Sequence, residues 1–275
     1  MHKHLSHALT GLAAAGLLVL SAAQAVADDT QRLRELINAP HRNPDNVARN
    51  DVRHPVETLQ FFGLQSGQTV VEILPSGGWY TEILAPFLKD NGTFYAAHFS
   101  PNSPLAYQLP ILEQFLTKTS AEPEIYGEMI VTRLNPPSET EIAPPGSADL
   151  VMTFRNVHNW IMAGTQKEHF AAFYQALKPG GVLGVVEHRA PAGSSMEFMS
   201  TSGYVTQDYV IELAREAGFE LEASSEINAN PRDTKDHPSG VWTLPPNFRL
   251  GDVDRAKYAA IGESDRMTLK FRKPE

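Results

Sequence analysis

Apolar runs of strand length alternate with helical segments over most of this chain, and this alternation restricts its possible folds most. The runs at 69–74, 149–154 and 182–187 lack the regular polar positions of a half-exposed strand, as expected of parallel strands buried on both faces. Apolar residues recur at helical spacing between them, at 79–88 and 165–177. Strands that alternate with helices predict an α/β fold with a doubly wound, mostly parallel sheet.

The remaining elements complete a seven-stranded sheet. Met267, Leu269 and Phe271 alternate with other residues near the end of the chain, which predicts a last, antiparallel strand near an edge. Thr165 and Glu168 have the spacing of a capping box at the start of the clearest helix. The seven strands are expected at 69–74, 93–97, 129–134, 149–154, 182–187, 219–227 and 266–272. Further helices are expected at 30–37, 54–62, 109–116 and 206–217.

The length of 275 residues and the continuity of the pattern predict one folded domain over 54–275. A polar segment over 28–53 precedes it and is expected to form an irregular N-terminal arm. Proline, asparagine and aspartate are frequent in 228–262, which predicts an irregular insertion or flap within the domain.

The first residues predict export. Lys3 and three histidines precede an apolar run from Ala8 to Leu20, and Ala25-Val26-Ala27 has the small-residue pattern of a cleavage site. This order is typical of a signal peptide over 1–27, and the apolar run is shorter than a membrane span. We therefore expect a secreted, periplasmic protein without stable membrane insertion after cleavage. The alternative is an uncleaved N-terminal anchor helix.

Charge and motif content exclude several classes of function. The formal net charge is −9 and there is no basic stripe, which argues against nucleic acid as a partner. The chain has no cysteine, so disulfides and thiol chemistry are excluded. It also lacks a His-Glu-x-x-His motif and any dense acidic cluster, so no metal site is predicted. The serine-hydrolase elbow and the phosphate-binding P-loop are absent as well.

The first predicted strand and the turn after it carry the most informative residues. An open parallel sheet binds its ligand beyond the carboxyl ends of its strands, where the strand order reverses. Glu72 lies in this strand, and Gly77 and Gly78 lie in the turn before Trp79-Tyr80-Thr81. With this order of elements the chain resembles the class I S-adenosylmethionine-dependent methyltransferases, and in particular an exported, predicted-methyltransferase branch with a divergent glycine loop. The resemblance implies a Rossmann-like fold and S-adenosylmethionine as the cofactor.

The resemblance also implies which residues bind the cofactor. Glu72 with the glycines would hold the methionine end, His98 the ribose region, and Phe154 with Asn156 the base side. The chain has Leu74 and Ser76 at two earlier glycine positions of the family, and His98 where the family has a ribose-binding acid. The full expected set is Glu72, Gly77, Gly78, Tyr80, His98, Phe154, Arg155 and Asn156.

Two histidines follow strand ends and are the candidates for catalysis. His158 lies in the segment 154–160, Phe-Arg-Asn-Val-His-Asn-Trp, and His188 ends the next strand. A general base is needed only if the methyl acceptor must lose a proton, and we expect His158 first and His188 second in that role. The alternatives are a solvated loop at 154–160 and an ion pair at the rim between Glu187 and Arg189.

Three functions remain open at this point. The first is a methyltransferase that acts on a small molecule. The second is a periplasmic small-molecule-binding protein that has kept the fold and lost the chemistry, which would explain Leu74, Ser76 and His98 together. The third is an enzyme of another class that uses the same pocket, since fold does not fix function.

Overall fold

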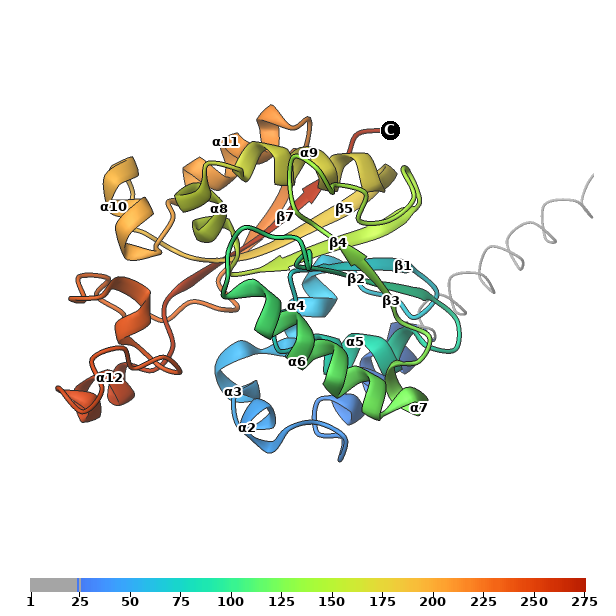
Figure 1. The fold of residues 1–275 in the computed structure, drawn as a ribbon, viewed down its shortest axis with the longest axis horizontal. Helices are drawn as coiled ribbons and strands as arrows, with labels where there is room; N and C mark the ends of the chain where they lie inside the picture. The colour runs from blue at the N-terminus through green and yellow to red at the C-terminus, as the bar shows by residue number, and fades with distance from the viewer. Residues whose placement is uncertain (1–23, 25) are drawn as a thin grey trace, which may run out of the picture.

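The structure, a computed structural model, describes residue 24 and residues 26–275 (Figure 1). The signal-peptide prediction over 1–27 falls largely outside these residues. Among the helices of the described part, none has both the length and the apolar composition needed to cross a bilayer.

A seven-stranded sheet forms the centre of the described chain, in the order β3-β2-β1-β4-β5-β7-β6 (Figure 1). The strands from β3 to β5 are parallel, whereas β7 runs antiparallel to both of its neighbours. The sheet confirms the predicted fold class. Its strands are β1 Thr69–Ile73, β2 Thr93–His98, β3 Ile130–Arg133, β4 Ala148–Phe154, β5 Leu177–His188, β6 Glu220–Ser225 and β7 Arg266–Arg272.

Helices cover both faces of the sheet, because successive strand residues point to opposite sides. Val71 belongs to an apolar core shared with α8, α9 and α11, whereas Val70 belongs to a second core shared with α4 and α5. The helices of the domain are α4 Pro55–Phe62, α5 Thr81–Leu88, α6 Gln108–Ala121, α7 Pro123–Tyr126, α8 Val157–Ala163, α9 Gln166–Ala176, α10 Met196–Ser202, α11 Gln207–Glu216 and α12 Arg255–Ile261. A helix over 26–36 precedes them.

Several local predictions differ from the structure. Thr165 makes no side-chain cap bond to α9, whereas Thr206 accepts a hydrogen bond from the Tyr209 amide at the start of α11. The segment 178–181 belongs to a long β5 rather than to a separate turn. The last strand agrees with its prediction, because β7 is antiparallel and lies near an edge, between β5 and the edge strand β6.

Two segments expected to be irregular contain short helices. The arm holds α2 Pro44–Val47 and α3 Asn50–Arg53, and the insertion holds α12 and the 3-10 helix η1 Gly240–Thr243. The insertion is anchored by Asn228, which is buried and donates to the hydroxyls of Thr58 and Thr268 at 3.0 and 2.9 Å. It therefore packs against the domain at the start of β7, where Figure 1 shows it at the lower left.

Candidate functional site

A cavity of about 820 Å³ lies at the carboxyl ends of β1 and β4, where the strand order reverses. This volume falls in the range of small-molecule sites. The side chains and backbone around it come from the turn after β1, the loops after β2 and β3, the start of α8 and the insertion. They include Glu72, Leu74, Ser76, Tyr80, Phe99, Asn135, Phe154, Arg155, Asn156, Trp242 and Asn247.

The turn after β1 follows a glycine-like path without glycine at two of its positions. Leu74 and Ser76 have φ angles of 45° and 54°, in the left-handed region that disfavours side chains. The Leu74 amide donates to the carbonyl of Ala97 at 2.8 Å, which fixes the turn against β2. Gly78 is required at φ 79°, where a Cβ would lie 3.2 Å from the Phe115 ring. The backbone shape is thus retained at a cost of about 1 kcal/mol for each strained residue.

Glu72 places a buried carboxyl group at the cavity. Its side chain is in the interior of β1, and Oε2 accepts a hydrogen bond from the Thr81 hydroxyl at 2.6 Å. Burial raises the pKa of Glu72 to about 8, against the opposing effect of this hydrogen bond. The carboxyl group is therefore mostly protonated at neutral pH, and a cation in the cavity would favour its ionised form.

His98 is turned away from the cavity. Its Nδ1 accepts a hydrogen bond from the Phe99 amide at 2.7 Å, so Nε2 carries the proton and donates to the carbonyl of Ser76 at 3.1 Å. Burial lowers the pKa of His98 and keeps the ring neutral. Both ring nitrogens are thus used to hold the turn after β1, and the side chain does not line the cavity.

The aromatic wall of the cavity joins β1 to β4. Tyr80 stacks on Phe154 with ring centroids 3.7 Å apart and an interplanar angle of 14°. Asn156 closes the crevice between the two strands, because its side-chain amide donates to the carbonyl of Ile73 at 3.0 Å. Arg155, between them, has a φ angle of 61° and lines the cavity.

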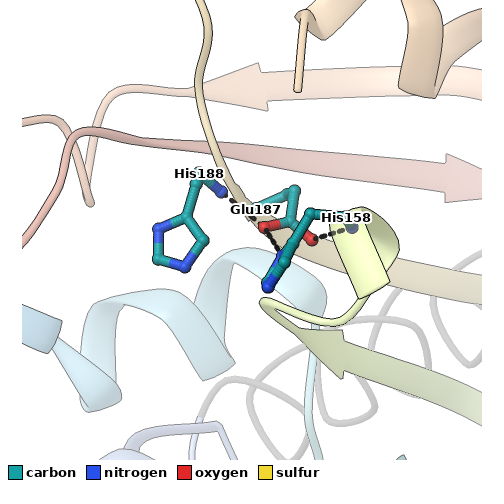
Figure 2. Close-up of side chains that lie close together, drawn as sticks. All are labelled: His158, Glu187 and His188. Carbon is teal, nitrogen blue, oxygen red and sulfur yellow. Dashed lines mark hydrogen bonds and ion pairs between the residues drawn. The ribbon is translucent and has the colours of Figure 1, made fainter. Parts of the chain in front are cut away.

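The two candidate catalytic histidines lie on either side of Glu187 (Figure 2). Neither of them is among the residues that line the cavity. Glu187 is fully buried and lies 3.0 Å from Nδ1 of His158. The same carboxylate accepts the backbone amides of His158 and His188 at 3.3 and 2.8 Å. A carboxylate at Nδ1 holds the proton there and leaves Nε2 of His158 as a proton acceptor.

His188 is held from the opposite side. Its Nδ1 lies 2.5 Å from the Ser264 hydroxyl, and its ring centroid is 5.2 Å from that of His158. Burial, the adjacent His158 and the positive charge of Arg155 lower the pKa of His188 well below its usual value. His188 is therefore neutral at physiological pH. Trp242 from the insertion lines the cavity, and its ring centroid lies 6.0 Å from that of His158.

Within the described residues, His158, Glu187 and His188 bring their donor atoms within 4.8 Å of one another, close enough for a metal ion. The surroundings disfavour a cation there. Glu187 is already satisfied by three N–H groups, and Arg53, Arg155 and Arg266 add positive charge that acts on His188. His158, unlike His188, has a carboxylate partner that would offset this positive charge when the ring takes up a proton.

The structure divides the residues expected from the sequence into two groups. Glu72, Tyr80, Phe154, Arg155 and Asn156 line the cavity; Gly77 and Gly78 shape the turn beside it, and His98 supports that turn. Arg189 pairs with Asp265 and Glu226 instead of with Glu187. Sequence reasoning missed the role of Glu187 as the partner of His158, although its position beside His188 was a usable signal. It also did not predict that Trp242 and Asn247 line the cavity, or that Glu263 pairs with Arg266 beside it.

Comparison with known proteins identifies the fold. No protein-family model and no curated protein sequence matches the chain. A SAM-dependent methyltransferase from Aquifex aeolicus is similar in structure, with a TM-score of 0.55 and 13% identity over 89% of this chain and 98% of the other. The phosphoethanolamine N-methyltransferase 2 of Haemonchus contortus, solved with S-adenosyl-L-methionine, has a TM-score of 0.52 and 16% identity over 89% and 60% of the two chains.

A third similar structure shows how far the likeness extends. The [4+2]-cyclase SpnF has a TM-score of 0.53 and 17% identity over 81% of this chain and 80% of its own. The chain thus has the Rossmann-like fold of S-adenosylmethionine-dependent methyltransferases, and this fold also occurs in a protein named for different chemistry.

Proposed function

We propose that this chain, which has the fold of S-adenosylmethionine-dependent methyltransferases, transfers a methyl group from that cofactor to a small molecule. The observation that carries the proposal is the cavity at the strand-order reversal, bounded on one side by Glu72 and the strained turn over Leu74 and Ser76. Strain of this kind persists only where the surrounding structure enforces it, and it is concentrated at functional sites.

The residues at this end of the cavity fit the cofactor. S-adenosylmethionine carries positive charge, and the buried, protonated Glu72 carboxyl group is suited to ionise beside a cation. The turn keeps its backbone in the path that glycines usually take, and Tyr80 with Phe154 supplies an aromatic surface. When bound, the cofactor would supply an activated methyl group that can be displaced from sulfur.

The remaining residues would position the acceptor and take up its proton. Nε2 of His158 is the proton acceptor that the Glu187 contact leaves free. His188, held neutral by burial and by nearby positive charge, is the second candidate. Trp242 lines the cavity and its ring lies 6.0 Å from that of His158, so an acceptor that reaches His158 from the cavity would contact this indole ring.

Calorimetry on the purified mature protein tests the proposal directly. S-adenosylmethionine and S-adenosylhomocysteine should each give saturable heat, and the thermal midpoint should rise. Glu72→Ala should weaken both ligands, whereas replacement of the exposed Glu57 by alanine is the matched control. Absence of heat and of a thermal shift with either ligand at millimolar concentration would contradict the proposal.

One observation favours the alternative of a non-catalytic binding protein. His98 occupies the position of the ribose-binding acid, and both of its ring nitrogens are engaged within the protein. A cavity with a different small molecule would then be expected. Mass spectrometry of the denatured, purified protein should in that case release a stoichiometric ligand other than S-adenosylmethionine or S-adenosylhomocysteine.

We further propose that the protein acts in the periplasm. The support is the signal-peptide pattern of residues 1–27 in the sequence. Cell fractionation with N-terminal sequencing should find the chain outside the inner membrane and beginning at Asp28. A chain that retains residues 1–27 would contradict the cleavage.

A further inference from the structure

Four arginines surround one carboxylate beside the cavity. Arg49 and Arg53 come from the arm, Arg155 follows β4, and Arg266 begins β7. Each of them forms an ion pair with Glu263. In the described part of the chain, no other carboxylate pairs with any of the four. The cluster therefore carries four positive charges against one negative charge.

The distances show that Glu263 does not satisfy all four partners equally. Its carboxylate oxygens lie 2.7 Å from Nε of Arg49, 3.2 Å from Nε of Arg53 and 3.0 Å from Nη1 of Arg266. The contact to Nη1 of Arg155 is longer, at 3.7 Å. Three arginines thus share the two carboxylate oxygens, and Arg155 is the weakly held member.

Two buried guanidinium nitrogens of the cluster have no hydrogen-bond partner in the described part of the chain. They are Nη2 of Arg49 and Nε of Arg266. Within residues 26–275, the Arg155 side chain has only the long contact to Glu263, although three-quarters of it is buried. Buried charged groups are normally paired and hydrogen-bonded, because removing them from water is costly.

The cluster reaches the cavity through Arg155, which is part of the cavity wall. Arg53 lies behind the wall, with its guanidinium over the ring of the wall residue Trp79 at 4.8 Å from the centroid. The positive charge of Arg155, Arg266 and Arg53 also acts on His188, whose pKa it lowers. The surplus charge therefore acts both at the cavity wall and at the histidine pair.

We propose that Arg155, with Arg53, Arg49 and Arg266 behind it, forms an oxyanion-binding subsite for a small molecule that bears a carboxylate or phosphate group. A planar guanidinium suits both groups, because its N–H donors match two oxygens at once. The identification of this molecule as the methyl acceptor rests on the proposed function. Its reacting atom would then lie near His158, with the anionic group on Arg155.

Anion binding to the whole mature protein, without S-adenosylmethionine, tests the subsite. Titration calorimetry with inorganic phosphate and with malonate should give saturable binding that weakens as sodium chloride is added. Arg155→Gln should weaken phosphate binding at least tenfold. Arg155→Lys should weaken it by a smaller factor, because lysine keeps the positive charge but lacks the paired N–H donors of the guanidinium. Arg32→Gln is the matched control, since Arg32 is also partly buried and pairs with Asp90.

A measurement on the unaltered protein covers the case in which a variant fails to fold. An arginine-directed dicarbonyl reagent should modify Arg155 in the free protein, and peptide mass spectrometry should show protection by phosphate. Modification of Arg32 should not change. Absence of saturable binding of both anions to the unaltered protein, wild-type affinity in a folded Arg155→Gln variant, or equal modification with and without phosphate would each overturn the subsite.

The outcome is distinguishable from failure of the proposed function. Phosphate binding without any binding of S-adenosylhomocysteine would support the subsite and contradict the methyltransferase. Binding of S-adenosylhomocysteine without phosphate or malonate binding would contradict the subsite and support the methyltransferase.

Discussion

The two halves of the site differ in how their polar groups are used. On the β1–β2 side, His98 is bonded to a backbone carbonyl group and Glu72 is bonded to Thr81. On the β4–β5–β7 side, among the described residues, Nε2 of His158 has no hydrogen-bond partner and the Arg155 side chain has only the long contact to Glu263. The first half is held together internally, whereas the second half keeps donors and acceptors available.

This difference indicates where specificity resides. The β1–β2 side presents backbone, an aromatic wall and one neutral carboxyl group, which suits a ligand recognised by shape and by a single cation. The β4–β5–β7 side combines surplus positive charge with a carboxylate-held histidine, which suits an anionic molecule that loses a proton. We therefore expect the two halves to respond to substitution in opposite ways, and four variants test this.

Glu187→Gln is expected to have the largest effect. The change leaves the shape intact but replaces a buried carboxylate that accepts three N–H groups, and we expect a loss of about 4 kcal/mol in the free energy of unfolding. Urea denaturation measures this loss, and ¹⁵N NMR should show that His158 loses its fixed Nδ1–H tautomer. Glu226→Gln, at an exposed carboxylate, is the control. An unchanged tautomer would show that Glu187 does not orient His158.

Glu72→Gln should stabilise the protein. Because the pKa of Glu72 is about 8 in the folded chain and near 4.5 when unfolded, stability of the natural protein falls as pH rises from 4.5 to 8. The glutamine variant lacks this decline and should be more stable by about 3 kcal/mol at pH 7. Urea unfolding at several pH values measures the difference, with Glu57→Gln as control. Parallel pH profiles for variant and natural protein would refute the prediction.

Glu263→Gln should destabilise the protein by about as much as Glu72→Gln stabilises it. Attraction to Arg53, Arg266 and Arg155 outweighs burial and lowers the pKa of Glu263 to about 2. Its stabilising contribution is therefore present above pH 4.5 and is lost as pH falls toward 2. We expect the free energy of unfolding of the variant to be about 3 kcal/mol lower than that of the natural protein at pH 7. This difference should become smaller as the pH falls toward 2.

Phosphate provides a second readout for the same variant. Without Glu263 the four arginines lack the one ionic partner that they have among the described residues, so added phosphate should restore more stability to Glu263→Gln than to the natural protein. Equal thermal shifts in the two proteins would count against an anion-binding cluster.

Ser76→Gly should have the smallest effect. Glycine adopts the φ angle of 54° without a side-chain penalty, so the free energy of unfolding of the variant should be higher by about 0.5 to 1 kcal/mol. Thermal denaturation measures this difference. Ser138→Gly is the control, because Ser138 is exposed and has no positive φ angle; it should lose stability slightly. A loss at Ser76 as well would mean that its side chain contributes more than the strained backbone costs.

The sheet could be predicted from the sequence because buried parallel strands have an unambiguous apolar pattern. The runs that became β1, β4 and β5 were found in this way, and the reversal of strand order placed Glu72 near Asn156. The short helices α8, α10 and α12 were missed, since seven residues carry too little periodicity to identify a helix.

The candidate site was predictable only where chemistry follows a strand end. Leu74 and Ser76 stand at two glycine positions of the family, and residue identity alone does not reveal that the backbone keeps the glycine path there. The orientation of His98 depends on a carbonyl 22 residues away. The partners of Glu263 lie up to 214 residues from it, so no local pattern could have grouped them.

The separation of these partners along the chain has a consequence for biogenesis. Arg49 is synthesised long before Arg266, so a nascent chain that ends before β7 does not contain the whole charge cluster. Such a chain would lack the complete anion-binding subsite proposed above. The four arginines come together only when β7 inserts between β5 and β6.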